Sequence, residues 1–186
     1  MSGKAIGIQM GCGYPGTFAR NSDCIVMARM VKNVIGDSGP SFGDPMVLNT
    51  DNTIQSVADF IAAARTNGTF TAALFLGVAV REIKTYEIYS ASMPAVGGYA
   101  INSMADVLER GSISVICRVG TPVAGGAVYV RIAAGSEPSG YVIGGFEYRA
   151  DTDTDSCVLV TNAKWTTGLM DTNRVCELTI LTRNLP

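Results

Sequence analysis

The chain has 186 residues and a formal net charge of −2, and 47% of its residues are hydrophobic against 16% charged. This composition excludes a disordered chain, and the slightly acidic balance provides no attraction to nucleic acid or to an anionic membrane. The longest apolar run, residues 72–80, is too short to span a bilayer, and the first residues do not form a secretory signal. We therefore expect a protein made in the cytoplasm.

Residues 1–30 differ from the rest of the chain because glycine recurs through their first half. Glycine at this density disfavours a regular helix, and Gly13–Gly16 carries a turn signal. A frayed terminus is the alternative, but it would not need apolar anchors such as Tyr14 and Phe18. We therefore predict an extended N-terminal arm over residues 1–30, followed by a β-rich domain over residues 31–186.

The first part of this domain contains short apolar runs separated by polar loops. Cys24–Val34 fits either a strand or a short helix, and periodicity does not decide between them. Met46–Leu48 predicts a short strand that follows a loop rich in glycine and proline. Residues 72–80 predict a buried strand.

Residues 53–66 predict the one main helix, because an apolar stripe recurs there with the helical spacing. Asp51, Asn52 or Thr53 can cap its start, and Asn67–Gly68 supplies a stop.

The stretch Glu109–Ala134 has the clearest strand pattern in the chain. Apolar side chains alternate with polar ones on both of its arms, as expected for strands with one buried face. Gly120–Gly126 joins the arms and contains the glycine and proline residues that let a chain turn back. The pattern predicts an antiparallel hairpin. The apolar positions are Ile113, Val115, Cys117, Val119, Val128, Val130 and Ile132.

Further elements flank this stretch. Ser103–Leu108 predicts a single helical turn, and Tyr141–Tyr148 predicts a strand with a bulge at its paired glycines. Cys157–Val160 and Val175–Arg183 predict two more strands. Six to nine strands, turns rich in glycine, proline and aspartate, and one main helix together predict a mainly β barrel or sandwich.

Residues that carry chemistry are scarce. The chain has no histidine, which removes the usual general base and the triads that depend on it. The five cysteines lack metal-site spacing, and Cys117 and Cys176 fall on apolar strand positions, so we expect reduced core residues. Asp151–Asp155 lacks the glycine and glutamate of a calcium loop. We predict no enzyme activity, no metal and no cofactor.

Several motifs in their order along the chain resemble the cement (decoration) proteins of tailed-bacteriophage heads. The resemblance covers nearly the whole length, and each motif alone is only a glycine turn or a strand pattern. The motifs are Gly13-Tyr-Pro-Gly-Thr-Phe-Ala-Arg20, Gly77-Val-Ala-Val-Arg-Glu-Ile-Lys84, Arg110-Gly-Ser-Ile-Ser-Val115, Gly120-Thr-Pro-Val-Ala-Gly-Gly-Ala-Val-Tyr-Val-Arg131, Gly144-Gly-Phe-Glu147, Thr161-Asn-Ala-Lys-Trp165 and Glu177-Leu-Thr-Ile-Leu-Thr-Arg-Asn184.

This resemblance implies a tulip-like β-barrel or sandwich that binds the outer surface of the virion, usually as a homotrimer. Its partner would be the major capsid protein, several copies of which it would bridge to stabilise the expanded head, with no contact to nucleic acid or membrane. The arm residues Tyr14, Pro15, Phe18 and Arg20 are the expected capsid-binding residues. Tyr86, Tyr89 and Tyr99 are expected at a subunit interface.

Three alternative functions remain open from the sequence. A phage tail or baseplate structural protein has the same composition. A host-surface or carbohydrate-binding module would use the same three tyrosines, although tyrosine is also common between subunits. An enzyme is the third alternative, and the lack of histidine disfavours it.

Overall fold

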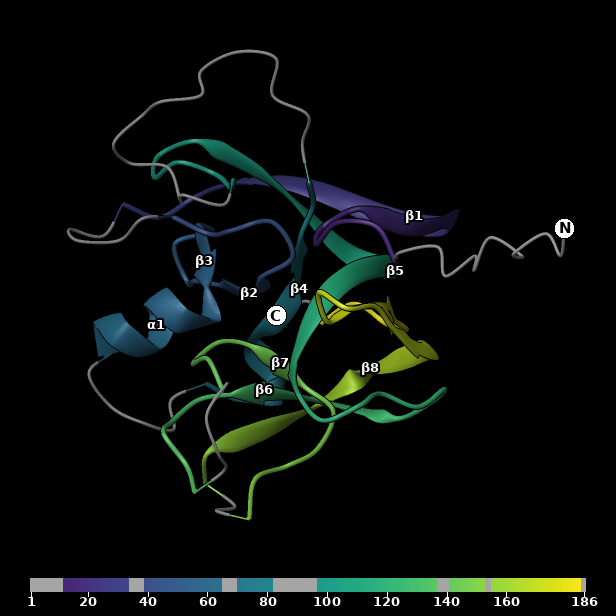
Figure 1. Cartoon of the computed structure of the whole chain (residues 1–186). Helices are drawn as coiled ribbons and strands as arrows, with labels where there is room; N and C mark the ends of the chain where they lie inside the picture. The colour runs from purple at the N-terminus through teal and green to yellow at the C-terminus, as the bar shows by residue number, and fades with distance from the viewer. Residues whose placement is uncertain are drawn as a thin grey trace, which may run out of the picture.

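The computed structural model describes residues 12–33, 39–64, 70–81, 97–136, 141–152 and 155–184, and the fold is built almost entirely from strands (Figure 1). These residues contain one α-helix, which confirms a mainly β fold. The elements are β1 Phe18–Met30, β2 Pro45–Leu48, β3 Ile54–Ser56, α1 Val57–Ala64, a 3₁₀ turn Ala72–Leu74, β4 Phe75–Ala79, β5 Met104–Val119, β6 Ala127–Arg131, β7 Phe146–Glu147, β8 Cys157–Met170 and β9 Val175–Ile180.

Five strands close into a barrel in the order β5-β7-β6-β8-β9, since β9 also pairs with β5. β7 runs parallel to β5, and the other neighbours in the barrel are antiparallel. Closure leaves these strands without the free edges that an open sheet would expose. The predicted barrel is thus confirmed.

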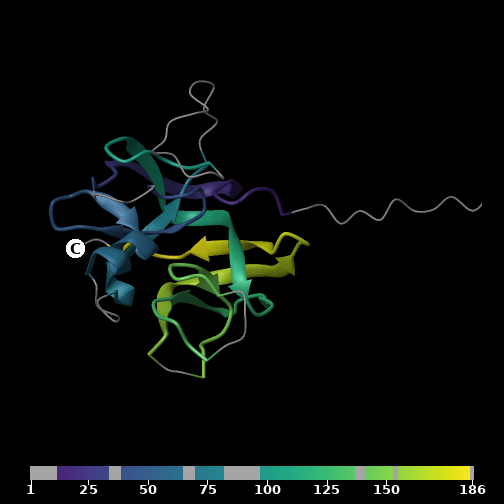
Figure 2. The same cartoon turned by 60° about the vertical axis from the view of Figure 1, so that its left-hand side comes forward.

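The remaining strands extend the sheet from the first half of β5. β1 pairs with β5 from Met104 to Ile113, and β4 pairs with it at Val107 and Leu108 and continues the sheet into β2 and β3. In Figure 2 the green and yellow strands of the barrel lie below the purple and blue strands of this extension. β5 therefore belongs to both halves of the molecule.

A bulge in β1 marks the place where β5 passes from the extension to the barrel. Between two pairings, β1 advances from Arg20 to Ile25 while β5 moves only from Ser112 to Arg110. The residue opposite the bulge, Gly111, has φ of +120°, and a Cβ there would lie 2.7 Å from Cys24 Sγ. Only glycine fits this close approach, so the sequence of β5 itself places the junction.

The predicted hairpin between the two arms of Glu109–Ala134 is wrong, although both arms are strands. β7 lies between β5 and β6, and β6 pairs with β7 and β8. The connection after β5 bonds elsewhere: the N–H of Gly125 donates to the Trp165 carbonyl over 2.7 Å. Alternation shows which face of a strand is buried, but it does not identify the neighbouring strand.

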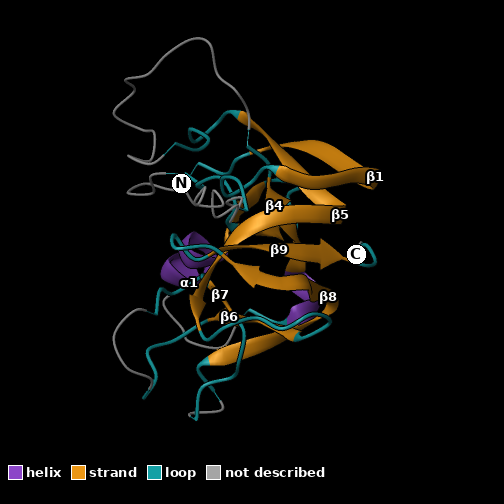
Figure 3. Ribbon diagram, turned by 45° about the vertical axis from the view of Figure 1, so that its right-hand side comes forward, coloured by secondary structure: helices purple, strands orange, loops and turns teal. Residues whose placement is uncertain are grey.

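The helix begins later than predicted. Ser56 caps α1, since its Oγ accepts from the N–H of Asp59 over 3.1 Å and donates to the Asp59 carboxylate over 2.7 Å. The predicted caps instead shape the turn between β2 and β3, where Asp51 Oδ1 accepts from the N–H of Thr53 over 3.1 Å. The predicted stop at Asn67–Gly68 lies outside the described residues. Figure 3 shows α1 beside β7 at one end of the barrel.

Other boundaries also differ from the sequence prediction. Ser103–Leu108 is not a helical turn, because β5 starts at Met104. The strand predicted over Tyr141–Tyr148 is reduced to β7, and the one predicted over Cys157–Val160 continues to Met170. Cys24–Val34, left open between strand and helix, contributes to β1. Because β1 begins at Phe18, the predicted arm is part of the sheet from that residue onward.

The core has two parts that lie on opposite faces of β4. Phe75 and Val78 belong to the larger cluster, which fills the barrel and includes the fully buried Trp165. Leu76 and Ala79 belong to the smaller cluster in the extension. All five cysteines are free, and Cys117 and Cys176 are buried in the larger cluster, as predicted. Among the described residues no helix is long and apolar enough to cross a membrane.

A buried ionic cluster links β6, β7 and the segment after β7. Arg131 forms a two-bond pair with Glu147, at 2.7 and 2.8 Å, and its Nη1 donates to Asp151 over 2.6 Å. Gly135 leaves room for this cluster, since a Cβ there would collide with the Asp151 carboxylate. Asp151, the first of the alternating aspartates, is therefore committed to an ion pair, and the described residues contain no group suited to a metal ion.

Candidate functional site

A tight turn at Tyr14–Thr17 fixes the N-terminal segment to the body of the protein. The N–H of Thr17 donates to the Tyr14 carbonyl over 3.1 Å, and the Thr17 hydroxyl donates to the same oxygen over 2.7 Å. Gly16 has φ of +82°, which the third residue of a type II turn requires and glycine adopts without strain. The turn signal at Gly13–Gly16 is thus realised one residue further along the chain.

Gly16 also connects this turn to both neighbouring strands. Its N–H donates to the Ser114 carbonyl in β5 over 2.7 Å, and its carbonyl accepts from the N–H of Arg81, just after β4, over 2.7 Å. A Cβ at Gly16 would lie 2.8 Å from that backbone nitrogen, so a larger residue would displace the chain. The turn is therefore fixed between β4 and β5, and Cys12 before it is also bonded, since its carbonyl accepts from Ser114 Oγ over 2.7 Å.

Two of the predicted capsid-binding residues present aromatic rings at this point. Tyr14 is 68% exposed, and the Arg81 guanidinium lies 4.9 Å from its ring centroid. The same guanidinium lies 5.5 Å from the Phe42 ring, so the two rings share one cation. Phe18 is 41% exposed. Pro15 contacts the body instead: its Cβ would lie 2.7 Å from a Cβ added to Gly43.

Arg20, the fourth predicted capsid-binding residue, has a carboxylate partner within the chain. Its Nε donates to Glu177 Oε1 in β9 over 2.7 Å, and this bond raises the pKa of the arginine. The Arg20 side chain is 59% exposed, so the pair lies at the surface, where ion pairs contribute little to stability. The structure thus brings Tyr14, Pro15, Phe18 and Arg20 together around the start of β1.

Tyr99, predicted at a subunit interface, is an internal residue, so this prediction is wrong. It is 1% exposed, its hydroxyl donates to the Val80 carbonyl over 2.7 Å, and its ring packs edge-on against Phe42 at 5.3 Å. A side chain already buried within one chain offers no surface to a second subunit. The other two predicted interface residues, Tyr86 and Tyr89, lie outside the described residues.

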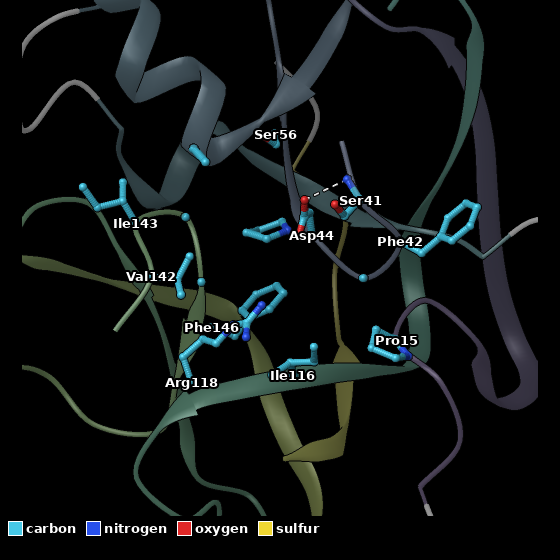
Figure 4. Close-up of a pocket in the computed structure, with 15 residues that line it drawn as sticks. Pro15, Ser41, Phe42, Asp44, Ser56, Ile116, Arg118, Val142, Ile143 and Phe146 are labelled. Carbon is cyan, nitrogen blue, oxygen red and sulfur yellow. Dashed lines mark hydrogen bonds between the residues drawn. The ribbon is translucent and has the colours of Figure 1, made fainter. Parts of the chain in front are cut away.

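A cavity of about 200 Å³ opens beside the turn (Figure 4). Pro15 forms part of its wall, so the cavity adjoins the N-terminal turn. Asp44 and Arg118 bring opposite charges to the cavity, and the remaining lining is mostly small or apolar. The other residues are Ser41, Phe42, Gly43, Pro45, Ser56, Ala58, Ile116, Val142, Ile143, Gly144, Gly145 and Phe146.

Burial changes the acidity of the carboxyl group in this cavity. Loss of solvent raises the pKa of Asp44 to about 6, an effect strengthened by the nearby negative charge of Asp59. The Ser41 N–H, which donates to Asp44 Oδ2 over 2.8 Å, and the positive charge of Arg118 oppose this change. Burial also raises the pKa of Asp59. Asp44 is therefore a carboxylate that can lose its charge in mildly acidic solution.

Sequence reasoning did not identify this cavity. Its walls come from the N-terminal turn, the loop before β2, the junction of β3 and α1, the end of β5 and the segment that leads into β7. Asp44 resembles any aspartate in a loop, and Arg118 occupies a polar position of an alternating strand. The nearest signal was the glycine pair Gly144–Gly145, since paired glycines in an apolar run indicate close backbone approach.

The comparison with family models identifies one family over residues 3–181, described as "Structural cement protein (E217 gp24/Pam3 gp6)". The comparison with curated proteins finds no match. Among solved structures, a chain of "The capsid of Myoviridae Phage XM1" is similar, with 17% sequence identity and a TM-score of 0.56. The match covers 92% of this chain and 91% of that chain, and at this identity it shows a shared fold. Because the family model spans nearly the whole sequence, the chain belongs to the phage structural cement protein family.

Proposed function

We propose that this protein binds the outer surface of a phage head, bridges neighbouring copies of the major capsid protein and stabilises the expanded shell. The observation that carries the proposal is the N-terminal turn, which Gly16 ties to β4 and β5 while Tyr14 and Phe18 remain exposed. Membership of the cement family supports a structural role in the virion. In this proposal the protein acts by binding alone, without catalysis or a cofactor.

The physical basis is the combination of a rigid body with a fixed point of attachment for the preceding segment. Backbone bonds at Gly16 keep the start of the arm in place, so less conformational entropy is lost when the arm binds. Exposed aromatic rings such as Tyr14 and Phe18 bury a large area for few rotatable bonds. The body and the arm can then contact different capsid subunits.

We further propose that the protein acts as a homotrimer. A trimer presents three arms, and linked contacts increase the overall affinity by roughly 10²–10⁴ over a single one. The net charge of −2 favours this protein contact over contact with packaged DNA or a membrane. Light scattering of the purified protein measures the state directly, and a monomer would contradict this part of the proposal.

The experiment that tests capsid binding uses expanded heads that lack this protein. The wild-type chain, a variant without residues 1–13, and Phe18→Ser are added, and bound protein is quantified after sedimentation. Leu159→Ser is the matched control, because Leu159 lies on β8 and is 41% exposed, the same fraction as Phe18. We expect weaker binding of both arm variants and unchanged binding of the control.

Two results would contradict the proposal. Failure of the wild-type chain to bind expanded heads would remove the proposed function altogether. Equal binding by the wild-type chain and both arm variants would mean that the protein binds the capsid without using its N-terminal segment. Cryo-electron microscopy of decorated heads then checks that the bound protein lies on the outer surface and touches more than one capsid subunit.

A further inference from the structure

Arg118 is an arginine without an ionic partner among the residues that the structure describes. It lines the cavity beside the N-terminal turn, and it forms no hydrogen bond or ion pair with any residue that the structure describes. Other arginines do have such partners in carboxylates or backbone carbonyls. They include Arg20, Arg29, Arg110, Arg131, Arg174 and Arg183.

The surrounding backbone holds the Arg118 side chain in the cavity. A Cβ at Gly145 would lie 2.8 Å from Arg118 Cγ, so the aliphatic part of the arginine lies across that glycine. Figure 4 shows the arginine beside the ring of Phe146, which is buried. A guanidinium that is already positioned loses less conformational freedom on binding than one at the end of a free side chain.

Asp44, the carboxylate in the same cavity, does not form an ion pair with Arg118. The positive charge of Arg118 acts to lower the pKa of Asp44, but the two side chains are not in contact as an ion pair. Asp44 Oδ2 accepts from the Ser41 N–H instead. The donors of the guanidinium therefore remain available to a group that enters from outside. A second carboxylate fits them best, because the planar guanidinium can donate two parallel bonds to it.

The rim of the cavity favours a protein as the source of that carboxylate. Val142 and Ile143 are exposed at this rim, and Pro15 forms another part of the wall. Arginine beside apolar side chains is typical of the centre of a protein interface, where desolvation strengthens a charge pair. Since Pro15 belongs to the N-terminal turn, the same partner surface can also touch the exposed ring of Tyr14.

We propose that this cavity receives an acidic side chain of the capsid partner, whose carboxylate pairs with Arg118 while flanking apolar residues cover Val142 and Ile143. This inference rests on the proposed capsid-binding function and adds the recognition chemistry. It commits to a glutamate or aspartate at the surface of the shell. A small free carboxylate is the other possible source of the same group.

The test compares three variants on expanded heads that lack this protein. Arg118→Gln removes the charge, Arg118→Glu reverses it, and Arg110→Gln is the matched control, because Arg110 also lies on β5 and pairs with Asp23 at the exposed surface. Thermal unfolding of each variant checks that it folds. We expect Arg118→Gln to weaken binding at least about tenfold, Arg118→Glu to weaken it further, and the control to bind as the wild type does.

Other outcomes would overturn the inference. Wild-type affinity in both Arg118 variants, with the wild-type chain bound to heads, refutes the cavity as a contact site and leaves the proposed function intact. Failure of the wild-type chain to bind heads refutes both. Glutarate is the probe for a small acid: if it binds the wild-type chain and depends on Arg118 while head binding does not, the cavity is a small-carboxylate site and the protein occupant is wrong.

Discussion

Two arginines that both lie beside Gly145 differ in how their charge is paired. In the cluster at β6, Arg131 is fully buried and satisfied by Glu147 and Asp151, with bonds of 2.6 to 2.8 Å. In the cavity at the end of β5, Arg118 has no ionic partner in the part of the chain that the structure describes, and Asp44 accepts from a backbone N–H instead. The paired charge of Arg131 holds parts of the fold together, whereas the charge of Arg118 in the cavity is available to a binding partner.

The extension contains a second example of the first kind. Glu109 is fully buried on β5 and accepts from Arg29 of β1 over 3.2 Å and from Arg183 Nε, near the C-terminus, over 2.7 Å. These bonds join three segments that are far apart in the sequence. Both buried clusters thus hold separate parts of the chain together, which no local contact in one strand can do.

The largest expected difference comes from removing the charge of each of these two arginines. We expect Arg131→Gln to lower the free energy of unfolding by about 3–5 kcal/mol, because the buried Glu147 would lose the cation with which it forms two bonds. Arg118→Gln should change it by no more than about 0.5 kcal/mol, since no partner is lost. Urea unfolding measures both. Similar losses in the two variants would contradict the comparison.

The pH dependence of stability tests the cavity carboxylate. The folded-state pKa of Asp44, about 6, lies above its ordinary value of 3.8, so the folded chain holds this proton more tightly than the unfolded chain does. The protonated carboxyl group therefore contributes to the free energy of unfolding below pH 3.8, and this contribution is lost as the pH rises through 6. The loss amounts to about 1–3 kcal/mol for this partly solvated group.

Asp44→Asn keeps the acceptor for the Ser41 N–H and removes the charge. We therefore expect it to be more stable than the wild type at about pH 8 and similar near pH 4. Urea unfolding at the two pH values checks this. A stability difference of the same size at both would show that Asp44 is not a carboxylate with a raised pKa.

The N-terminal turn can be tested against another glycine with the same backbone conformation. We expect Gly16→Ala to cost about 2 kcal/mol, because alanine is strained at this positive φ and its Cβ meets the Arg81 backbone. Gly125→Ala is the control: φ is +73° there, but no atom lies within 4 Å of an added Cβ. Thermal unfolding compares them, and equal costs would mean that the turn does not press against β4.

The smallest effect is expected for the exposed pair at the start of β1. Arg20→Gln removes the bond to Glu177, but solvent and salt already screen this pair, so the melting temperature should change by no more than about 2 °C. Calorimetry at low and high salt measures the shift. A change of more than about 5 °C would mean that the Arg20–Glu177 pair stabilises the fold as strongly as the buried ionic clusters do.

Local patterns were sufficient for the two strand arms of Glu109–Ala134 and for the N-terminal turn, but not for the start of β5, which was predicted as a helical turn. Alternating apolar residues in β5 correctly predicted that Ile113, Val115 and Cys117 are buried, but Ser112 and Ser114 on its polar face are buried as well. Tyr14–Thr17 forms a turn because proline and glycine favour its backbone angles whatever surrounds them. The position of Phe18, Tyr14 and Arg20 near one another follows from the same short stretch of chain.

Tertiary structure decided the neighbours of β5, the burial of Tyr99 and the cavity. β7 lies between β5 and β6 because strand pairing depends on how distant segments pack and close the barrel, which a pattern of period two does not specify. Tyr99 fills the smaller core since Phe42 and the Val80 carbonyl meet it there. The cavity needs five separate segments, so it exists only once they have packed around β5.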